Sequence, residues 1–263
     1  MKPDYKNWVP KGMIWGLFAG FAACSFLFII FGVSGILAKG TLKTIILIVF
    51  LIATIAFGIM TAWMYKMHQA FDYNGTRKMS KQIIDGIAEY VKIPDGGKGM
   101  DVGCGSGALA IACAKRNPNA TIIGVDRWGK EYASFSKSLC EKNAEIEGVA
   151  NTSFEKGDAL KLDFPDETFD AVFSNYVYHN IPSSDRQSIL LETLRTLKKG
   201  GTFAIHDIFS KSKYGDVNAF VDKLKTMGYE EVELIDTTDG MFMTKNEASW
   251  MSLTGSAMLY GKK

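Results

Sequence analysis

The sequence MDVGCGSG at residues 100–107 lies between a short apolar run and an amphipathic stretch. Glycine at positions 103, 105 and 107 permits a tight turn from a strand into a helix and lets a ligand approach the backbone closely. The first turn of that helix offers N–H groups without intrahelical partners. The GxGxG spacing differs from the GxGxxG of a dinucleotide fold, and the Lys-Ser/Thr ending of a phosphate loop is missing. By itself the stretch predicts either a nucleotide-binding turn or a glycine turn that binds nothing.

Short apolar runs alternate with amphipathic stretches from residue 99 to the end of the chain. The runs predict strands at 99–102, 121–125, 152–155, 169–174, 202–205, 232–235 and 257–260. The amphipathic stretches predict helices near 107–117, 128–147, 184–198 and 215–227. Such alternation is typical of a parallel sheet with helices on both faces. We expect a doubly wound, mainly parallel α/β sheet of seven strands, with one of the last two strands antiparallel because no long helix separates them.

Further motifs follow the next strands in order. Asp126 ends the second strand, where a carboxylate can accept hydroxyl hydrogen bonds from a ribose. Gly157-Asp158-Ala159 follows the third strand, Asn175 ends the fourth, and Leu197 to Gly201 is expected to form the turn into the fifth. With these motifs, residues 75–263 closely resemble the class I S-adenosylmethionine-dependent methyltransferases, which have a Rossmann-like fold.

The resemblance implies that S-adenosylmethionine binds at the carboxyl ends of the strands and leaves as S-adenosylhomocysteine. Asp101, Gly103 and Gly105 would line its methionine part, and Asp126 would bind its ribose. Arg127 and Trp128 would lie beside the ribose or the adenine. Asp158 would accept a hydrogen bond from the adenine amino group, unless it is a solvated loop aspartate, and Ala159 would offer its amide. Asn175 would lie close to the methyl sulfonium and face the acceptor.

Candidate bases for methyl transfer follow the fourth strand. They are Tyr176, Tyr178 and His179, of which His179 can titrate near neutral pH, while Asn175, just before them, is a catalytic candidate that would face the acceptor. The alternative is that His179 and Tyr178 only pack where the chain turns. A second candidate is the pair His206-Asp207 after the fifth strand, where the aspartate would orient the imidazole. These residues provide general-base candidates, although an in-line methyl transfer depends mainly on aligning the two reactants.

An apolar segment precedes this domain. Two runs, of 27 and 22 residues, carry no charged side chain. About 20 apolar residues cross a bilayer as a helix, so we expect spans at about 13–37 and 43–65, joined by a tight link at Ala38 to Thr41. We therefore divide the chain into a transmembrane hairpin (1–71), a connecting helix and linker (72–98), and a methyltransferase domain (99–263).

Charge predicts the orientation of this hairpin. Residues 1–71 have a net charge of +5, and the rest of the chain has −3. Lysines and arginines gather near the two outer ends of the hairpin, so the positive-inside bias predicts a protein of the cell membrane with both termini and the catalytic domain in the cytoplasm. Gly12, Gly16 and Gly20 lie four residues apart, which either allows close helix contact or reflects the frequency of glycine in spanning helices.

Several other functions are disfavoured by the sequence. The small basic excess argues against binding to nucleic acid. Cys24, Cys104, Cys113 and Cys140 follow no metal or disulfide spacing, which agrees with a reducing compartment and with a protein that has no metal site. Arsenite methylation is disfavoured as well, because it needs grouped thiolates outside the cofactor loop.

The leading hypothesis is a membrane-anchored methyltransferase whose small acceptor we expect to be lipophilic or membrane-associated. The segment from Thr237 to Leu253, rich in methionine and aromatic residues, either forms a wall of an apolar acceptor pocket or packs in the core. The alternative function is a membrane scaffold or sensor that binds S-adenosylmethionine without turnover. The sequence leaves open the acceptor, the methylated atom and the oligomeric state.

Overall fold

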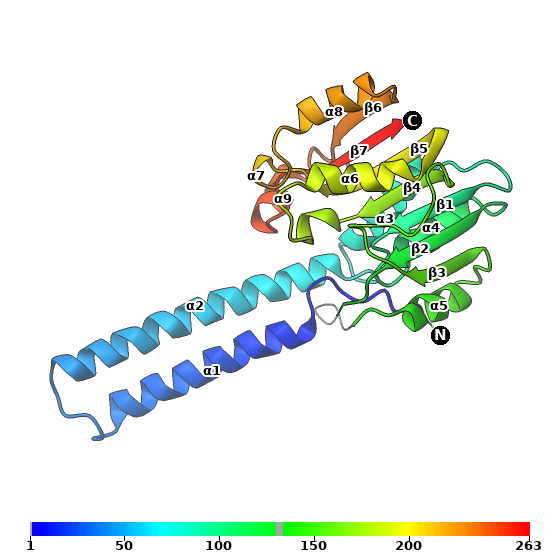
Figure 1. Cartoon of the computed structure of the whole chain (residues 1–263). Helices are drawn as coiled ribbons and strands as arrows, with labels where there is room; N and C mark the ends of the chain where they lie inside the picture. Colours follow the sequence, from blue (N-terminus) through cyan, green and yellow to red (C-terminus); the bar gives the residue numbers. More distant parts are fainter. Residues whose placement is uncertain (1, 130–133) are drawn as a thin grey trace. The chain divides into compact units, whose positions relative to one another are not determined.

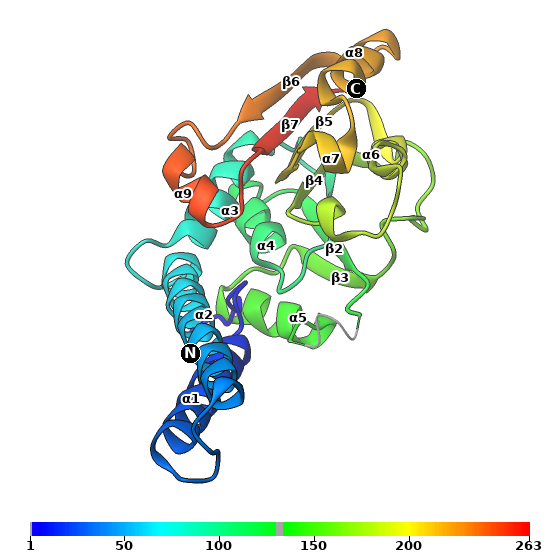
Figure 2. The same cartoon turned by 90° about the vertical axis from the view of Figure 1, so that its left-hand side faces the viewer.

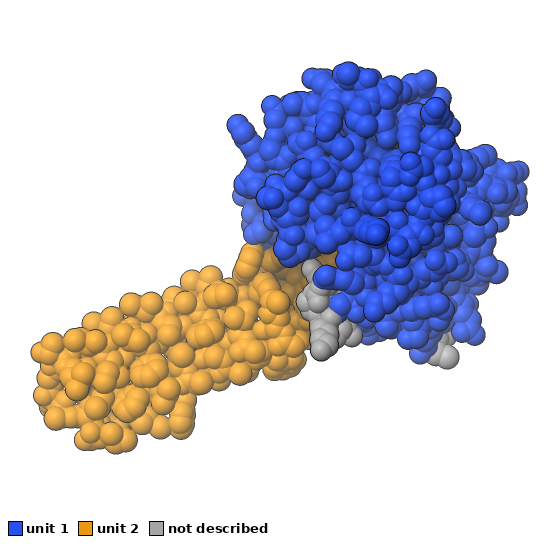
Figure 3. All heavy atoms as spheres, viewed as in Figure 1, with its two compact units in different colours: residues 1–6, 81–263 blue, residues 7–80 orange. Residues whose placement is uncertain are grey.

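The computed structural model describes residues 2–129 and 134–263, and the chain forms two compact units. One unit comprises residues 7–80, and the other comprises residues 1–6 together with residues 81–263 (Figure 3). The N-terminal six residues therefore belong to the same unit as the sheet, although about 70 residues separate the two parts in the sequence. The boundaries at residues 71 and 98 remain a prediction.

The smaller unit is built on helices α1 (Lys11–Val33) and α2 (Thr41–Phe71). Both are long and apolar enough to cross a membrane. Their bounds differ from the expected spans, because α1 ends at Val33 and α2 continues to Phe71. Ser34 adopts an extended conformation and its N–H donates to Ile30 O, which ends the helix just before Gly35, a residue that disfavours helix.

Glycine and phenylalanine alternate at the contact between these two helices. A Cβ atom added at Gly20 of α1 would lie 2.8 Å from Cε1 of Phe57, and one at Gly58 of α2 would lie 3.3 Å from Cδ2 of Phe21. A Cβ at Gly12 or Gly16 would meet nothing within 4 Å. Of the three glycines at four-residue spacing, Gly20 is therefore the one that lets a ring of the other helix approach.

The larger unit contains the expected seven-stranded sheet, with strand order β3-β2-β1-β4-β5-β7-β6. Its strands are β1 (Lys98–Val102), β2 (Thr121–Asp126), β3 (Thr152–Lys156), β4 (Phe169–Asn175), β5 (Leu197–Ile208), β6 (Glu230–Asp236) and β7 (Ser256–Lys262). Strand β7 pairs antiparallel with both β5 and β6, whereas the pairs from β3 to β5 are parallel (Figure 1). The antiparallel strand expected at the end of the sheet is thus β7.

Two expected boundaries in this unit are wrong. The segment from Leu197 to Gly201 is part of strand β5, and it pairs with the start of β4 through a register shift. The helix expected at 128–147 is α5 (Lys137–Ile146), which begins where the side chain of Ser136 accepts a hydrogen bond from Leu139 N. Residues 127–129 are irregular, and residues 130–133 of that predicted helix lie outside the described residues.

Helices pack on both faces of the sheet (Figure 2). The helices after α2 are α3 (Met79–Tyr90), α4 (Ala108–Arg116), α5, α6 (Arg186–Arg195), α7 (Lys211–Tyr214), α8 (Val217–Thr226) and α9 (Lys245–Trp250). Side chains alternate between the two faces along β1, since Met100 and Val102 join the core cluster that contains residues of α6 and α8, whereas Asp101 accepts a hydrogen bond from Ala110 of α4. This alternation positions Asp101 on the face of the glycine-rich turn.

Candidate active site

The carboxyl ends of β2, β1, β4 and β5 form one edge of the sheet. Asp126 is the last residue of β2, and Gly103 follows β1 directly. Asn175, the last residue of β4, lies opposite His206 of β5 in the strand register. Ligands of open α/β sheets bind outside this edge, so the sequence motifs meet where a cofactor and an acceptor could share a site.

The glycine-rich turn has the backbone conformation that its sequence predicts. Gly103, Gly105 and Gly107 have φ angles of 73°, 55° and 81°, in the left-handed region that favours glycine. A Cβ atom at Gly103 would also lie 2.3 Å from Cγ2 of Val177. Helix α4 starts directly after Gly107, so its first N–H groups are presented next to the turn.

Asp126 is joined to this turn by hydrogen bonds. One carboxylate oxygen accepts from Gly105 N at 2.8 Å, and the other accepts from Trp128 N at 2.7 Å. The indole Nε1 of Trp128 donates to Gly105 O at 3.0 Å. Each oxygen of Asp126 keeps a further lone pair, so the carboxylate can still accept hydrogen bonds from a ligand. Arg127, between Asp126 and Trp128, is exposed.

Asp101 lies beneath the turn and is almost fully buried, with 1% of its surface exposed. One of its oxygens accepts a hydrogen bond from Ala110 N at 2.9 Å. Burial raises the pKa of its carboxyl to about 8, and the nearby charge of Asp126 adds to this effect. At neutral pH Asp101 is therefore mostly protonated in this structure.

The predicted adenine residues follow strand β3. The side chain of Asp158 is half-buried, and its Oδ1 accepts a hydrogen bond from Leu160 N at 2.9 Å, which closes a local turn. Ala159 is half-buried against the hydrophobic core. This geometry fits a loop aspartate as well as an adenine ligand, since Oδ1 holds the turn and Oδ2 can accept another hydrogen bond.

His206 does not pair with its neighbour Asp207, contrary to the expectation from the sequence. Its Nδ1 lies 2.8 Å from Asn175 Oδ1, and its Nε2 lies 2.9 Å from Thr237 Oγ1. Successive residues of a strand point to opposite faces, so His206 and Asp207 cannot share one side of β5. Complete burial lowers the pKa of His206 to about 3, and the imidazole is therefore neutral and positions Asn175.

Asp207 instead pairs with His179. The Nδ1 atom of His179 lies 2.5 Å from Asp207 Oδ1, and His179 N donates to Asp207 Oδ2 at 3.2 Å. The Asp207 side chain has no exposed surface, whereas 14% of the His179 side chain is exposed. A buried carboxylate on Nδ1 fixes that nitrogen as the donor in the neutral ring and leaves Nε2 as the acceptor. The sequence had indicated both residues but not their pairing.

The two tyrosines beside His179 have structural partners. Tyr178 is completely buried, and its hydroxyl lies 2.8 Å from Thr193 Oγ1 of α6. The hydroxyl of Tyr176 lies 2.7 Å from Ser256 Oγ. Burial raises the pKa of both phenols, so neither hydroxyl loses its proton readily. The packing alternative therefore describes Tyr178 better than a catalytic role.

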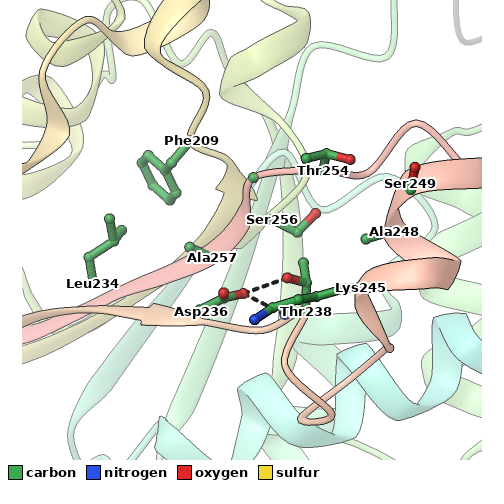
Figure 4. Close-up of a pocket in the computed structure, with 11 residues that line it drawn as sticks. Phe209, Leu234, Asp236, Thr238, Lys245, Ala248, Ser249, Thr254, Ser256 and Ala257 are labelled. Atoms are coloured by element: carbon green, nitrogen blue, oxygen red, sulfur yellow. Dashed lines mark hydrogen bonds between the residues drawn. The ribbon is translucent and has the colours of Figure 1, made fainter.

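A cavity of about 530 Å³ lies where β5, β6 and β7 meet α9 (Figure 4). Its apolar wall includes Phe209, Leu234, Ala248 and Ala257, and its rim carries charge from Asp236 and Lys245. Ser256, the hydrogen-bond partner of Tyr176, is one of the residues that line this cavity. The cavity therefore opens on the β5 to β7 side of the edge, whereas the glycine-rich turn lies on the β1 side.

The segment from Thr237 to Leu253 contributes to this cavity in a way that its composition did not predict. Phe242, Met243 and Met251 are buried and do not line the cavity. The segment contributes Thr238 and residues of α9 instead. No local pattern in the sequence distinguishes these lining residues from their neighbours.

Comparison with known proteins gives one matching family. A family model described as a methyltransferase domain matches residues 93–252. The sterol 24-C-methyltransferase of Aspergillus fumigatus is 27% identical over 164 residues, which are 61% of this chain and 41% of that protein. The demethylmenaquinone methyltransferase of Bacillus licheniformis is 30% identical over 138 residues, which are 52% of this chain and 56% of that protein. The chain thus spans about half the length of these relatives.

A solved structure has the same fold. The crystal structure of the cyclase SpnF matches 73% of this chain and 85% of its own, with a TM-score of 0.55 and 19% sequence identity. At this identity the likeness supports the architecture of the sheet and its helices, and the reaction has to be argued from the site. The fold expected from the sequence is confirmed.

Proposed function

This chain belongs to the methyltransferase domain family, and we propose that it transfers the methyl group of S-adenosylmethionine to a small, lipophilic acceptor at a membrane. The enzyme class and the cofactor follow from the family. The acceptor and the membrane are our inference. The observation that carries it is the order of groups along one sheet edge: the Asp126 turn, then Asn175, then the His179–Asp207 pair, then an apolar cavity.

The cofactor is assigned to the β2 and β1 part of this edge. Asp126 would accept hydrogen bonds from the ribose hydroxyls through its remaining lone pairs, and Trp128 would lie beside the ribose or the adenine. Asp158 and Ala159 are proposed for the adenine. Gly105 leaves space for the methionine part, because a Cβ atom there would meet nothing closer than 3.9 Å, and Gly103 forms the turn beside it, packed against Val177. Asn175, positioned by His206, would face the methyl group.

The His179–Asp207 pair is proposed as the base. Bound S-adenosylmethionine would supply the methyl group, which the acceptor atom would take through a lone pair while the electron pair of the broken C–S bond stays on sulfur. The acceptor proton passes to Nε2 of His179, and the buried carboxylate of Asp207 stabilises the imidazolium that forms. The same arrangement orients the imidazole. This chemistry suits an acceptor whose hydroxyl or amine loses a proton.

The cavity beside Ser256 is proposed to hold the apolar body of the acceptor. The Tyr176 side chain connects the cavity to the proposed base, since its hydroxyl contacts Ser256 and its ring centroid lies 5.9 Å from that of His179. The apolar wall favours a ligand that buries hydrocarbon surface. The names of the sterol and demethylmenaquinone relatives point to lipophilic acceptors too.

The membrane part of the proposal rests on α1 and α2, which are long and apolar enough to span. A helical hairpin would retain the enzyme at the surface where a lipophilic acceptor resides. The basic residues near its outer ends support a cytoplasmic catalytic unit in the cell membrane. Fusing alkaline phosphatase after Lys263 tests this orientation, because activity of that reporter requires an oxidising exterior and would contradict it.

The full-length enzyme in detergent micelles, incubated with methyl-labelled S-adenosylmethionine and a membrane lipid extract, tests the function. We expect label in an organic-soluble product with the wild type, and much less with Asp126→Asn at a cofactor concentration that does not saturate the variant. Transfer of label only into a water-soluble product would contradict the proposal that the acceptor is lipophilic. Cofactor binding without transfer into lipid, small-molecule or protein fractions would instead support a sensor.

A further inference from the structure

The first residues of the chain contact the cofactor turn through a buried side chain. Asn143 of α5 has 1% of its surface exposed. Its Oδ1 accepts a hydrogen bond from Asp4 N at 2.8 Å, and its Nδ2 donates to Asp4 O at 2.9 Å and to Ser106 O at 3.0 Å. The orientation of this amide is unambiguous, because a backbone N–H can only donate and the two carbonyls can only accept. Asn143 therefore joins residue 4 to the glycine-rich turn.

A second connection runs beside the first. Ser106 lies between Gly105 and Gly107, and its hydroxyl donates to Tyr5 O at 2.9 Å. Tyr5 is buried, with 6% of its surface exposed, and its hydroxyl donates to Glu147 Oε1 at 3.2 Å. We call residues 4–6 the N-terminal strap. The strap contributes no helix or strand to the unit, and its backbone is held by side chains of the turn and of α5.

Hydrogen bonds between Asp4 and Lys6 fix the conformation at the end of the strap. Lys6 adopts a φ of 55°, and its N–H donates to Asp4 Oδ1 at 3.1 Å. The hydrogen bond from the Lys6 ammonium holds the pKa of the Asp4 carboxyl below its usual value. Asp4 thus closes a tight turn, after which residues 7–10 lead into α1.

We propose that the N-terminal strap, acting through Asn143 and Ser106, is a positioning element that holds the glycine-rich turn in the conformation that binds S-adenosylmethionine. The hydrogen bonds form a continuous chain from Asp4 to Asn143, to the backbone of Ser106 and Gly105, and to the carboxylate of Asp126. Loss of the strap removes the hydrogen-bond partners of Asn143 Oδ1 and of the Ser106 hydroxyl beside the turn, and the turn then relaxes to satisfy these groups. The inference rests on the cofactor site proposed above.

A pair of substitutions at one residue tests the proposal in the full-length protein. Asp4→Pro removes the N–H that donates to Asn143, whereas Asp4→Ala removes the carboxylate and keeps that N–H. Neither substitution changes a residue between 81 and 263. We expect the dissociation constant for S-adenosylhomocysteine to be about 5- to 10-fold larger for Asp4→Pro than for Asp4→Ala, which is the range of a lost buried hydrogen bond. The rate at saturating cofactor should stay within about twofold.

Ser106→Ala is a second variant, because it removes one hydroxyl while keeping the turn sequence otherwise intact. It should weaken binding in the same direction, and it keeps the proposal testable if Asp4→Pro does not fold. If both Asp4 variants and Ser106→Ala bind S-adenosylhomocysteine as tightly as the wild type, the proposal is overturned, even if their melting temperatures fall.

Asp126→Asn in the same assay distinguishes a failure of the strap proposal from a failure of the proposed cofactor site. If Asp126→Asn weakens binding and the strap variants do not, the cofactor site holds and the strap has only a structural role. If none of the variants weakens binding, the site assignment falls as well.

Discussion

The imidazole of His179 and the carboxylate of Asp207 lie 2.5 Å apart, although they come from different strand ends and are 28 residues apart in the sequence. His179 is partly accessible, and Asp207 is completely buried. Of the two groups, only the imidazole is therefore accessible, and in the proposed reaction the carboxylate would act on the ligand through it. This relationship gives the first prediction.

Asp207→Asn should lower kcat by about 10²- to 10⁴-fold, the range for loss of a positioned general base. An asparagine can keep only one of the hydrogen bonds from the backbone N–H groups of His179 and Ile208, because these reach different carboxylate oxygens, and it removes the charge that stabilises the imidazolium. The measurement is methyl transfer at saturating cofactor, with the dissociation constant for S-adenosylhomocysteine determined in parallel. Asp170→Asn is the matched control, because Asp170 pairs with Lys198 near the start of β4. An unchanged kcat in Asp207→Asn would exclude His179 as a base that depends on Asp207.

Asp126→Asn should weaken binding of S-adenosylhomocysteine by about 10- to 100-fold, because hydrogen bonds to a charged acceptor are worth more than those to a neutral one. The substitution keeps the shape of the side chain beside Gly105 and Trp128. Titration calorimetry gives the dissociation constant. Asp163→Asn, at an exposed loop position, should bind like the wild type. If Asp126→Asn binds S-adenosylhomocysteine with the affinity of the wild type, the ribose does not bind to this carboxylate.

Asp101 should make stability depend on pH. Its folded-state pKa of about 8 lies above its ordinary value of 3.8, so folded Asp101 holds a proton that the unfolded chain has lost. Between these two values unfolding releases a proton, and the free energy of unfolding therefore falls as the pH rises from about 4 to about 8. Asp101→Asn has no proton to lose and should not show this fall.

The comparison uses melting temperatures of both proteins in the same detergent across this pH range. The stability of wild type relative to Asp101→Asn should decrease steadily toward pH 8. Other groups, including buried His206, contribute equally to both proteins and cancel in the difference. A difference that is flat with pH would show that the carboxyl titrates near its ordinary value.

Gly20→Val should destabilise the hairpin by about 1–3 kcal/mol, the usual cost of overpacking. Its new Cβ atom would lie 2.8 Å from the ring of Phe57 and force the two helices apart. Gly16→Val is the matched control, since nothing lies within 4 Å of a Cβ at that position. Protease digestion of the loop after Val33 in detergent measures the loosening. Equal cleavage rates in both variants would contradict the close contact between α1 and α2.

Sequence patterns predicted the features that depend on local chemistry. The glycine-rich turn and the strand end at Asp126 were identified because backbone conformation and strand periodicity are encoded within a few residues. The pairing of His179 with Asp207 was missed because it depends on which face of β5 each side chain occupies. That assignment requires the register with β4, which no short stretch of sequence contains.

The other misses have physical causes of the same kind. Helix α5 begins late because Ser136 caps it, a signal as short as one residue within a long amphipathic stretch. The contacts of Asp4 with Asn143 join residues that are 139 positions apart, and their polar groups occur equally in ordinary loops. The cavity beside Ser256 is formed by residues of β6, β7 and α9 and of the segments next to them, so its lining residues share no motif.

For the proposed membrane-anchored enzyme, the N-terminal strap also constrains the topology of the chain. Residues 1–6 and 81–263 complete one folded unit, so they must end in the same aqueous compartment. The number of crossings between them must therefore be even, whatever the charges at the hairpin ends. During synthesis, Asp4 leaves the ribosome long before Asn143 exists. The contact between Asp4 and Asn143 can form only after both helices have been made. In a molecule with a single inserted helix, the two residues would lie on opposite sides of the membrane and the contact would not form.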